Sequence, residues 1–257
     1  MEQITVVKVG GKILEDEATL QALLRDFAAI EGKKVLVHGG GRSATKMAAR
    51  LGVETTMIEG RRVTDDAMLD IVTMVYGGLV NKQVVARLQA CGINALGVTG
   101  ADLNLIHSHK RPVGAVDYGW VGDVDAADSD MLGNLIAMGA VPVVAPLTHD
   151  GMGHLLNTNA DSMAGAVATA LARLFDVRLV FCFEKEGVLE REDDDSSVIP
   201  IINSEKYARL KADGVVKDGM IPKLDNSFDT LHRGVKEVII TKAANLTDLA
   251  KGTHIVL

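Results

Sequence analysis

Cysteine is scarce in this chain: Cys91 and Cys182 are the only two among its 257 residues. They form no C-x-x-C pair, so neither a disulfide framework nor a zinc site is expected. Long apolar stretches are also missing, because the longest one, residues 135–147, contains a glycine and two prolines and is too short to cross a bilayer. No signal-peptide pattern precedes the first strand pattern, and we expect a cytoplasmic protein that makes no membrane contact.

Basic residues are too few to offset the acidic ones. The chain has 27 Lys and Arg against 34 Asp and Glu, which gives a net charge of −7, and it has no long basic run. Binding to nucleic acid through phosphate neutralisation is therefore not expected. A small anionic substrate stays compatible with this charge, since a local cluster of lysines and backbone N–H groups can oppose it.

Strand and helix patterns alternate along almost the whole chain. β-Branched runs at residues 4–9 and 34–38 end in glycines and are followed by apolar positions at helical spacing. This alternation predicts a three-layer αβα sandwich, in which helices cover both faces of a mainly parallel sheet. A long helix is expected over residues 65–91 with Thr64 as its N-cap, whereas residues 99–128 contain short alternating pieces that predict hairpins.

A glycine-rich turn follows the second of these strands. In Gly39-Gly40-Gly41 the main chain can approach an anion, and the helix that starts there offers free N–H groups and the positive end of its dipole. A tight turn that needs glycine for its geometry alone is the alternative. The segment also matches a loose dinucleotide fingerprint, Gly39-x-Gly41-x-x-Ala44, but no acidic residue closes a strand at the expected distance. The chain has neither a Walker A loop nor a G-x-S-x-G elbow.

A lysine precedes a second glycine turn, in Lys8-Val9-Gly10-Gly11. A buried ammonium group is costly unless it is paired or binds an anion, and this one lies at the carboxyl end of a strand, where α/β proteins bind ligands. Phosphoryl transfer needs mainly positioning and positive charge around the migrating group, so a second lysine on its other side would complete a minimal site. Lys223, at the start of a predicted helix, is the candidate, although each lysine alone is also compatible with a solvent-facing position.

Two further polar segments precede predicted helices. In Asn157-Thr158-Asn159-Ala160-Asp161, the side chains cap the helix or supply a carboxylate, Asp161, that orients both lysines. In Gly60-Arg61-Arg62-Val63-Thr64, the two arginines bind carboxylates in bidentate fashion or lie in a solvated basic loop. The residues alone leave both choices open.

Six segments occur in order along the whole chain: Val7-Lys8-Val9-Gly10-Gly11, Val37-His38-Gly39-Gly40-Gly41, Gly60-Arg61-Arg62-Val63-Thr64, Asn157-Thr158-Asn159-Ala160-Asp161, Asp218-Gly219-Met220-Ile221-Pro222-Lys223 and Gly252-Thr253-His254-Ile255. Together they resemble the branch of the amino-acid kinase family that phosphorylates N-acetylglutamate. The G-x-R-V-T and N-x-N-A-D patterns favour this branch over the carbamate, aspartate, glutamate 5- and uridylate kinases.

The resemblance implies a role for each of these segments. Lys8 and Lys223 would stabilise the migrating phosphoryl group from either side, Asp161 would orient both lysines, and the N–H groups of Gly11 and Gly40 would bind the same group. Arg62 would hold the α-carboxylate of the acylated glutamate, whose other contacts would be Gly40, Gly41 and Asn157. The nucleotide would lie near residues 184–189 and 215–217, and the implied cofactor-binding residues are Gly10, Gly11, Glu184, Gly187, Val216 and Lys217.

The resemblance also implies the reaction and the assembly. ATP would phosphorylate the γ-carboxylate of the N-acylated glutamate in line, without a covalent enzyme intermediate, as the second step of arginine biosynthesis. Mg²⁺ would be held by the phosphates, with no protein ligand. The fold would be a single domain, residues 1–257, around an open eight-stranded sheet. Its N-terminal lobe, about 1–175, would bind the acyl-glutamate and form a homodimer through the helix at 65–91, and its C-terminal lobe, about 176–257, would bind ATP.

Two segments depart from the family pattern. Relatives usually have leucine where Arg61 stands, and the additional guanidinium gives the hypothesis that Arg61 binds a larger or anionic acyl group, such as succinyl in place of acetyl. Residues 183–187, Phe-Glu-Lys-Glu-Gly, replace the usual T-D-V-x-G, so the resemblance does not fix the adenine contacts. Two alternatives stay open. A same-fold kinase of another carboxylate or of carbamate is disfavoured by Arg62 and Asn157, and a non-catalytic amino-acid sensor is disfavoured by the lysines and Asp161.

Overall fold

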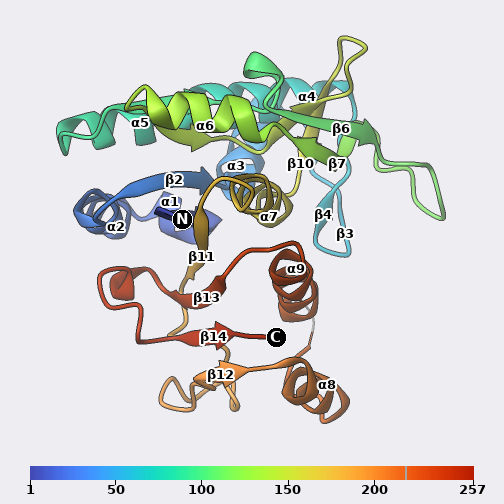
Figure 1. Cartoon of the computed structure of the whole chain (residues 1–257). Helices are drawn as coiled ribbons and strands as arrows, with labels where there is room; N and C mark the ends of the chain where they lie inside the picture. Colours follow the sequence, from blue (N-terminus) through green and yellow to red (C-terminus); the bar gives the residue numbers. More distant parts are fainter. Residues whose placement is uncertain (218) are drawn as a thin grey trace.

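An eight-stranded sheet forms the centre of this chain, whose computed structural model describes residues 1–217 and 219–257. From one edge to the other its strands are β12 (Ile201–Ile202), β14 (Thr253–Ile255), β13 (Glu237–Lys242), β11 (Asp176–Phe183), β1 (Gln3–Val9), β2 (Lys33–His38), β8 (Val141–Val144) and β5 (Ala95–Val98) (Figure 1). All neighbouring strands are parallel except β13 and β14. The mainly parallel, open sheet predicted from the sequence is confirmed.

Helices cover both faces of this sheet, and each face has its own hydrophobic core. The helices of one face are α2 (Glu17–Ala29), α3 (Gly41–Leu51), α4 (Asp66–Val72), the π-helical segment Thr73–Val80 and α5 (Asn81–Ala90), and those of the other face are α6 (Ser129–Ala137), α7 (Ala160–Leu171), α8 (Ser204–Ala212) and α9 (Met220–His232). The short helix α1 (Gly11–Glu15) and 3₁₀ turns at Asp102–Asn104 and Ala243–Asn245 complete the elements. The three-layer αβα arrangement is therefore confirmed. No helix in the described part of the chain is long and apolar enough to span a membrane.

Strand β1 supplies side chains to both cores. Ile4 and Val6 belong to the core that contains α7, whereas Val7 and Val9 belong to the opposite core, because successive side chains of a strand point to opposite faces. All four are fully buried, which stabilises the fold by roughly 1.5–3 kcal/mol per side chain. Lys8 has the same parity as Ile4 and Val6. Its side chain therefore points toward the face that α7 covers.

A small second sheet occupies the region in which hairpins were expected. β6 (Ile106–Lys110) and β7 (Val121–Ala127) do form an antiparallel pair. Each also pairs with a strand from later in the chain, β9 (Leu147–His149) or β10 (Leu155–Thr158), and the four strands close into a small barrel (Figure 1). The hairpin prediction was therefore incomplete, because these pairings join segments that local alternation cannot connect.

The long helix predicted over residues 65–91 is present, but it starts differently. Its N-cap is Asp65, whose Oδ1 accepts a hydrogen bond from the backbone N–H of Met68 at 2.8 Å. The hydroxyl of Thr64 instead donates to the carbonyl of Arg62 at 3.0 Å. The prediction of Thr64 as the cap is wrong, because both residue types can cap a helix and only the path of the preceding chain selects between them.

Candidate active site

Three charged side chains meet at the carboxyl end of strand β1. Nζ of Lys8 lies 2.7 Å from Oδ1 of Asp161, and Nζ of Lys223 lies 2.8 Å from Oδ2 of the same carboxylate. Lys8 belongs to β1, Asp161 to the first turn of α7 and Lys223 to the first turn of α9. Since α7 packs against both β1 and α9, the fold brings these three residues together.

The electrostatics of this triad favour an incoming anion. The side chains of Lys8, Asp161 and Lys223 are 12%, 24% and 15% exposed. Burial raises the pKa of Asp161, but the charges of Lys8 and Lys223 outweigh burial and hold that pKa well below its usual range. Burial lowers the pKa of Lys223, with the carboxylate of Asp161 opposing this effect. Two ammonium groups against one carboxylate leave an excess positive charge in a poorly hydrated place, which a phosphoryl group can neutralise.

Two asparagines fix the backbone around Asp161. Oδ1 of Asn159 caps α7 by accepting hydrogen bonds from the N–H groups of Asp161 and Ser162, at 2.8 and 3.1 Å. Nδ2 of Asn226, in α9, donates to the carbonyl of Asp161 at 3.0 Å. In this segment Asn159 is therefore the helix cap, whereas the side chain of Asp161 contacts both lysines.

The two predicted glycine turns lie side by side, and they differ in which N–H groups they leave free. The N–H of Gly39 donates to Val9 at 3.0 Å and that of Gly10 donates to Cys182 at 3.3 Å. No described backbone carbonyl accepts from Gly11, the first residue of α1, from Gly40, the N-cap of α3, or from Gly41, its first residue. Main-chain donors for an anion are therefore offered by Gly11, Gly40 and Gly41, while the N–H of Gly10 is engaged.

Both turns face one crevice of about 500 Å³, which is also lined by Arg62, Glu184 and Lys223. Nζ of Lys8 lies close to the glycine turn that lines this crevice, 4.0 Å from the position that a β-carbon on Gly10 would occupy. The crevice thus combines backbone donors with side-chain positive charge, which is the arrangement that the sequence analysis expected around a migrating phosphoryl group.

Gly40 is required because an aromatic ring packs directly on it. A β-carbon at this position would lie 2.6 Å from Cδ1 and 2.9 Å from Cε1 of Tyr76, which is 4% exposed in the π-helical segment. Burial raises the pKa of Tyr76, so its hydroxyl stays neutral beside Arg62. The sequence gives no sign of this role for Tyr76, because nothing local marks a tyrosine in a predicted helix as a neighbour of the glycine turn.

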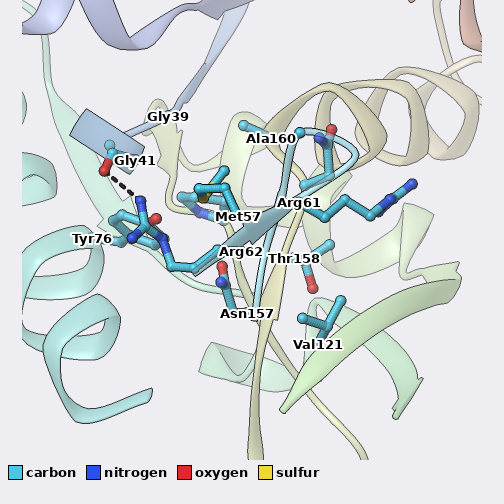
Figure 2. A pocket seen from close by; sticks show the side chains of 14 residues that line it. Gly39, Gly41, Met57, Arg61, Arg62, Tyr76, Val121, Asn157, Thr158 and Ala160 are labelled. Carbon is cyan, nitrogen blue, oxygen red and sulfur yellow. Dashed lines mark hydrogen bonds between the residues drawn. The ribbon is translucent and has the colours of Figure 1, made fainter. Parts of the chain in front are cut away.

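Arg62 is held firmly against the glycine turn. Nη2 donates to the carbonyl of Gly41 at 2.7 Å and to Oγ1 of Thr45 at 2.9 Å, and Nη1 donates to Oγ1 of Thr55 at 3.4 Å. The residue is 7% exposed, yet it lines both the crevice and an adjoining pocket of about 170 Å³ (Figure 2). A buried guanidinium that is fixed in this way is suited to binding a carboxylate.

Asn157 lines the same smaller pocket. Its Nδ2 donates to Oγ1 of Thr64 at 2.9 Å, which fixes the orientation of the amide. No hydrogen bond to a described residue involves its Oδ1, which leaves an acceptor for a substrate N–H group. The structure thus brings Gly40, Gly41, Arg62 and Asn157 to one pocket, as the predicted substrate set requires.

Arg61 also lines this pocket, but it points away from Arg62. The two residues form the short strand β4 (Arg61–Arg62), which pairs with β3 (Met57–Ile58), and consecutive strand residues face opposite sides. Figure 2 shows Arg62 directed at Gly41, whereas Arg61 extends the other way.

The predicted nucleotide residues divide between two cavities. Glu184 lines the crevice, while Gly187 and Lys217 line a neighbouring cavity of about 270 Å³, and Phe183 lines both. Val216 is only 2% exposed and belongs to the core, so its side chain cannot contact a ligand; Val215 lines the cavity instead. Asp218, which opens the motif containing Lys223, lies outside the described residues. Among the described residues, no group of three or more His, Cys, Asp or Glu side chains is placed to hold a metal ion.

A buried polar pair supports the glycine turn from behind. His38 is completely buried, with Nδ1 2.7 Å from the carbonyl of Gly39 and Nε2 3.1 Å from Nδ2 of Asn81. Burial lowers the pKa of His38 to about 4, so the ring is neutral, donates from Nδ1 and accepts at Nε2. Nδ2 of Asn81 also donates to the carbonyl of Val143 at 2.9 Å. His38 stood in a quoted motif, but the sequence alone gave no sign of Asn81.

Comparisons with known proteins identify the family of this chain. The model of the amino acid kinase family matches residues 3–242. The chain is 64% identical to an acetylglutamate kinase of Bacteroides fragilis, over 95% of this chain and 93% of that protein, and 63% identical to one of Bacteroides thetaiotaomicron, over 99% and 98%. The solved structure of smu.665 from Streptococcus mutans UA159 is 28% identical, covers 98% of both chains and superimposes with a TM-score of 0.81.

Proposed function

The chain belongs to the amino acid kinase family, and from that premise we propose that it is an acetylglutamate kinase, which transfers the γ-phosphoryl group of ATP to the γ-carboxylate of N-acetyl-L-glutamate in arginine biosynthesis. The observation that carries the proposal is the Asp161 carboxylate held between the ammonium groups of Lys8 and Lys223 beside two glycine turns. A protein that only bound an amino acid would need no such charge at the position of a migrating phosphoryl group.

The reaction is a direct in-line displacement. A γ-carboxylate oxygen of the substrate forms a bond to the γ-phosphorus of ATP as the bond to the bridging oxygen breaks, which gives an acyl phosphate and ADP. Negative charge spreads over the transferred group in the transition state, and Lys8 and Lys223 stabilise that charge from the triad. Gly11 and Gly40 add backbone N–H donors, and Asp161 keeps the two lysines at fixed positions.

The smaller pocket binds the acceptor. Arg62 holds the α-carboxylate, and Oδ1 of Asn157 accepts from the amide N–H that an acylated α-amino group carries. Free glutamate carries an ammonium group in that place and has no acyl group to fill the rest of the pocket, and carbamate has no α-carboxylate for Arg62. These two side chains are therefore the proposed basis of selectivity for an acylated amino acid.

ATP is proposed to lie along the crevice and the neighbouring cavity, with its phosphates at the glycine turns and its nucleoside near Gly187, Val215 and Lys217. Support comes from Phe183, which lines both spaces, so that the two adjoin. Mg²⁺, which neutralises phosphate charge when bound, is proposed to be held by the oxygens of ATP. The division into an acyl-glutamate lobe, about 1–175, and an ATP lobe, about 176–257, is part of this proposal.

A homodimer through the long helix and a cytoplasmic location stay predictions. Two exposed apolar side chains of the π-helical segment, Met74 at 54% and Leu79 at 43%, support a contact between copies at this helix. Sedimentation of the purified protein, compared with a Met74→Glu/Leu79→Glu variant, tests the dimer.

A coupled ADP-release assay with hydroxylamine trapping tests the activity. The panel contains N-acetylglutamate, free glutamate, aspartate and carbamate. We expect ADP release with N-acetylglutamate and an equal amount of the hydroxamate that an acyl phosphate yields. ADP release without hydroxamate, or faster release with carbamate, would contradict the proposal.

A further inference from the structure

Arg61 carries a positive charge that the phosphoryl-transfer site described above does not use. It lines the substrate pocket together with Arg62, but the two side chains leave strand β4 in opposite directions. Figure 2 shows the Arg61 side chain near Thr158 and Val121, on the side of the pocket away from Gly41. An α-carboxylate bound by Arg62 therefore leaves Arg61 facing another part of the substrate.

The carboxylate whose charge acts on Arg61, that of Asp123, is already paired with a different arginine. Asp123, in β7, forms a two-point ion pair with Arg111, whose Nε donates at 3.0 Å and whose Nη2 also donates. No described residue accepts a hydrogen bond from Arg61 or forms an ion pair with it. Asp123 thus acts on two guanidinium groups but forms an ion pair with that of Arg111 alone. Among the described residues, the positive charge of Arg61 is left uncompensated.

The environment of Arg61 makes this charge unfavourable without a ligand. Burial and then the charge of Arg111 lower the pKa of Arg61, while Asp123 opposes them. A guanidinium does not lose its proton near neutral pH, so the charge persists and an anion beside it is stabilised. Arg61 is half-buried, so water screens its charge less than it screens the charge of a fully exposed arginine. A carboxylate that binds there is therefore attracted more strongly.

From this arrangement we infer that Arg61 is a specificity-determining residue that binds a second carboxylate, at the far end of the acyl group of the substrate. The preferred acceptor is then a glutamate acylated by a dicarboxylic acid, with succinyl as the four-carbon case. The inference rests on the proposed kinase function and names the substrate class of its acceptor pocket. Val121 and Pro146, which line the same pocket, suit the methylene groups between the amide and that carboxylate.

Three acceptors separate charge from size. N-Succinylglutamate and N-butanoylglutamate have acyl chains of equal length, but only the first ends in a carboxylate, and N-acetylglutamate is the short neutral case. The values of kcat/KM are measured by ADP release for the wild type, for Arg61→Leu, and for Arg50→Leu as a matched control. Arg50 is an exposed arginine of α3 that does not line the pocket, so its replacement removes the same charge elsewhere.

We expect the wild type and Arg50→Leu to prefer N-succinylglutamate over N-butanoylglutamate by about 10- to 100-fold, the value of one charge-assisted bidentate contact. In Arg61→Leu this ratio falls to about one, through loss of activity with the succinyl acceptor. Equal use of the two four-carbon acceptors by the wild type, or an unchanged ratio in Arg61→Leu, would overturn the inference. Hydroxamate formation from N-acetylglutamate in those same experiments shows that the kinase proposal holds independently. Absence of hydroxamate with all three acceptors is the failure of the kinase proposal itself.

Discussion

Lys8 and Lys223 lie near opposite ends of the chain, yet the Nζ atom of each is within 2.8 Å of an oxygen of one carboxylate, that of Asp161. The pairing keeps two like charges together in a place that is largely shielded from water. In the proposed reaction, this positive field is in place before substrate arrives, so the protein need not reorganise when the phosphoryl group moves.

Replacement of Lys8 tests this field directly. In Lys8→Ala we expect kcat to fall by about 10²- to 10³-fold, while the KM values change little, because the lost interaction is strongest in the transition state. Lys33→Ala is the matched control, since Lys33 is the first residue of strand β2, at the end of the strands opposite to the triad, and pairs with Glu2. Steady-state kinetics measure both variants. An equal loss in Lys33→Ala, or a Lys8→Ala effect confined to KM, would argue against the role of Lys8.

Asp161→Asn keeps the shape of the triad but removes its negative charge. The two ammonium groups then face each other without compensation, and we expect the free energy of unfolding to fall by about 2 kcal/mol, together with kcat. Denaturant titration measures the stability, and raised salt should recover part of the loss by screening the repulsion. A variant as stable and active as the wild type would show that the two lysines do not depend on this carboxylate.

Gly40→Ala places a methyl group 2.6 Å from Cδ1 of Tyr76. The ring or the glycine turn must shift, and a displacement of this size next to the reacting groups lowers kcat/KM by about 10²-fold. Gly114→Ala is the control, because a β-carbon there meets no atom within 4 Å. The double variant Gly40→Ala/Tyr76→Ala should recover part of the activity, and a double variant worse than both single ones would contradict the steric explanation.

His38 makes the stability depend on pH. Its folded pKa of about 4 lies below the ordinary value of 6.5, so the unfolded chain takes up a proton first as the pH falls. The stabilising contribution is therefore complete above pH 6.5 and is lost as the pH approaches 4, by about 3 kcal/mol in total. We expect the difference in unfolding free energy between wild type and His38→Gln to shrink across this range. A constant difference between the two proteins from pH 7 to pH 4 would contradict the assignment of a neutral, buried ring.

The sequence by itself determined the layered α/β architecture and was enough to select most of the residues that are proposed to bind the acceptor and the phosphoryl group. Periodicity identified the strands and helices because buried faces repeat every two or about 3.6 residues, whatever the neighbours are. A glycine turn at the carboxyl end of a strand can likewise be recognised from a few neighbouring residues. Lys8 and Gly39-Gly40-Gly41 could therefore be selected as candidates from their chemistry alone. Lys223 and Asp161 were also candidates from the residues alone, each with a structural alternative, and the resemblance to a kinase family then joined them with Lys8 in one predicted site.

Only the tertiary structure decided how these residues contact one another. The packing of α7 between β1 and α9 places the Asp161 carboxylate on both lysines, and Asp123 of the barrel forms its ion pair with Arg111 and not with Arg61. The cap at Asp65 in place of Thr64, the ring of Tyr76 on Gly40, and the core position of Val216 were likewise set by contacts between distant segments. The physical reason is that periodicity and turn chemistry act over a few residues, whereas side-chain direction and charge pairing depend on which segments the sheet and its helices bring within a few ångströms.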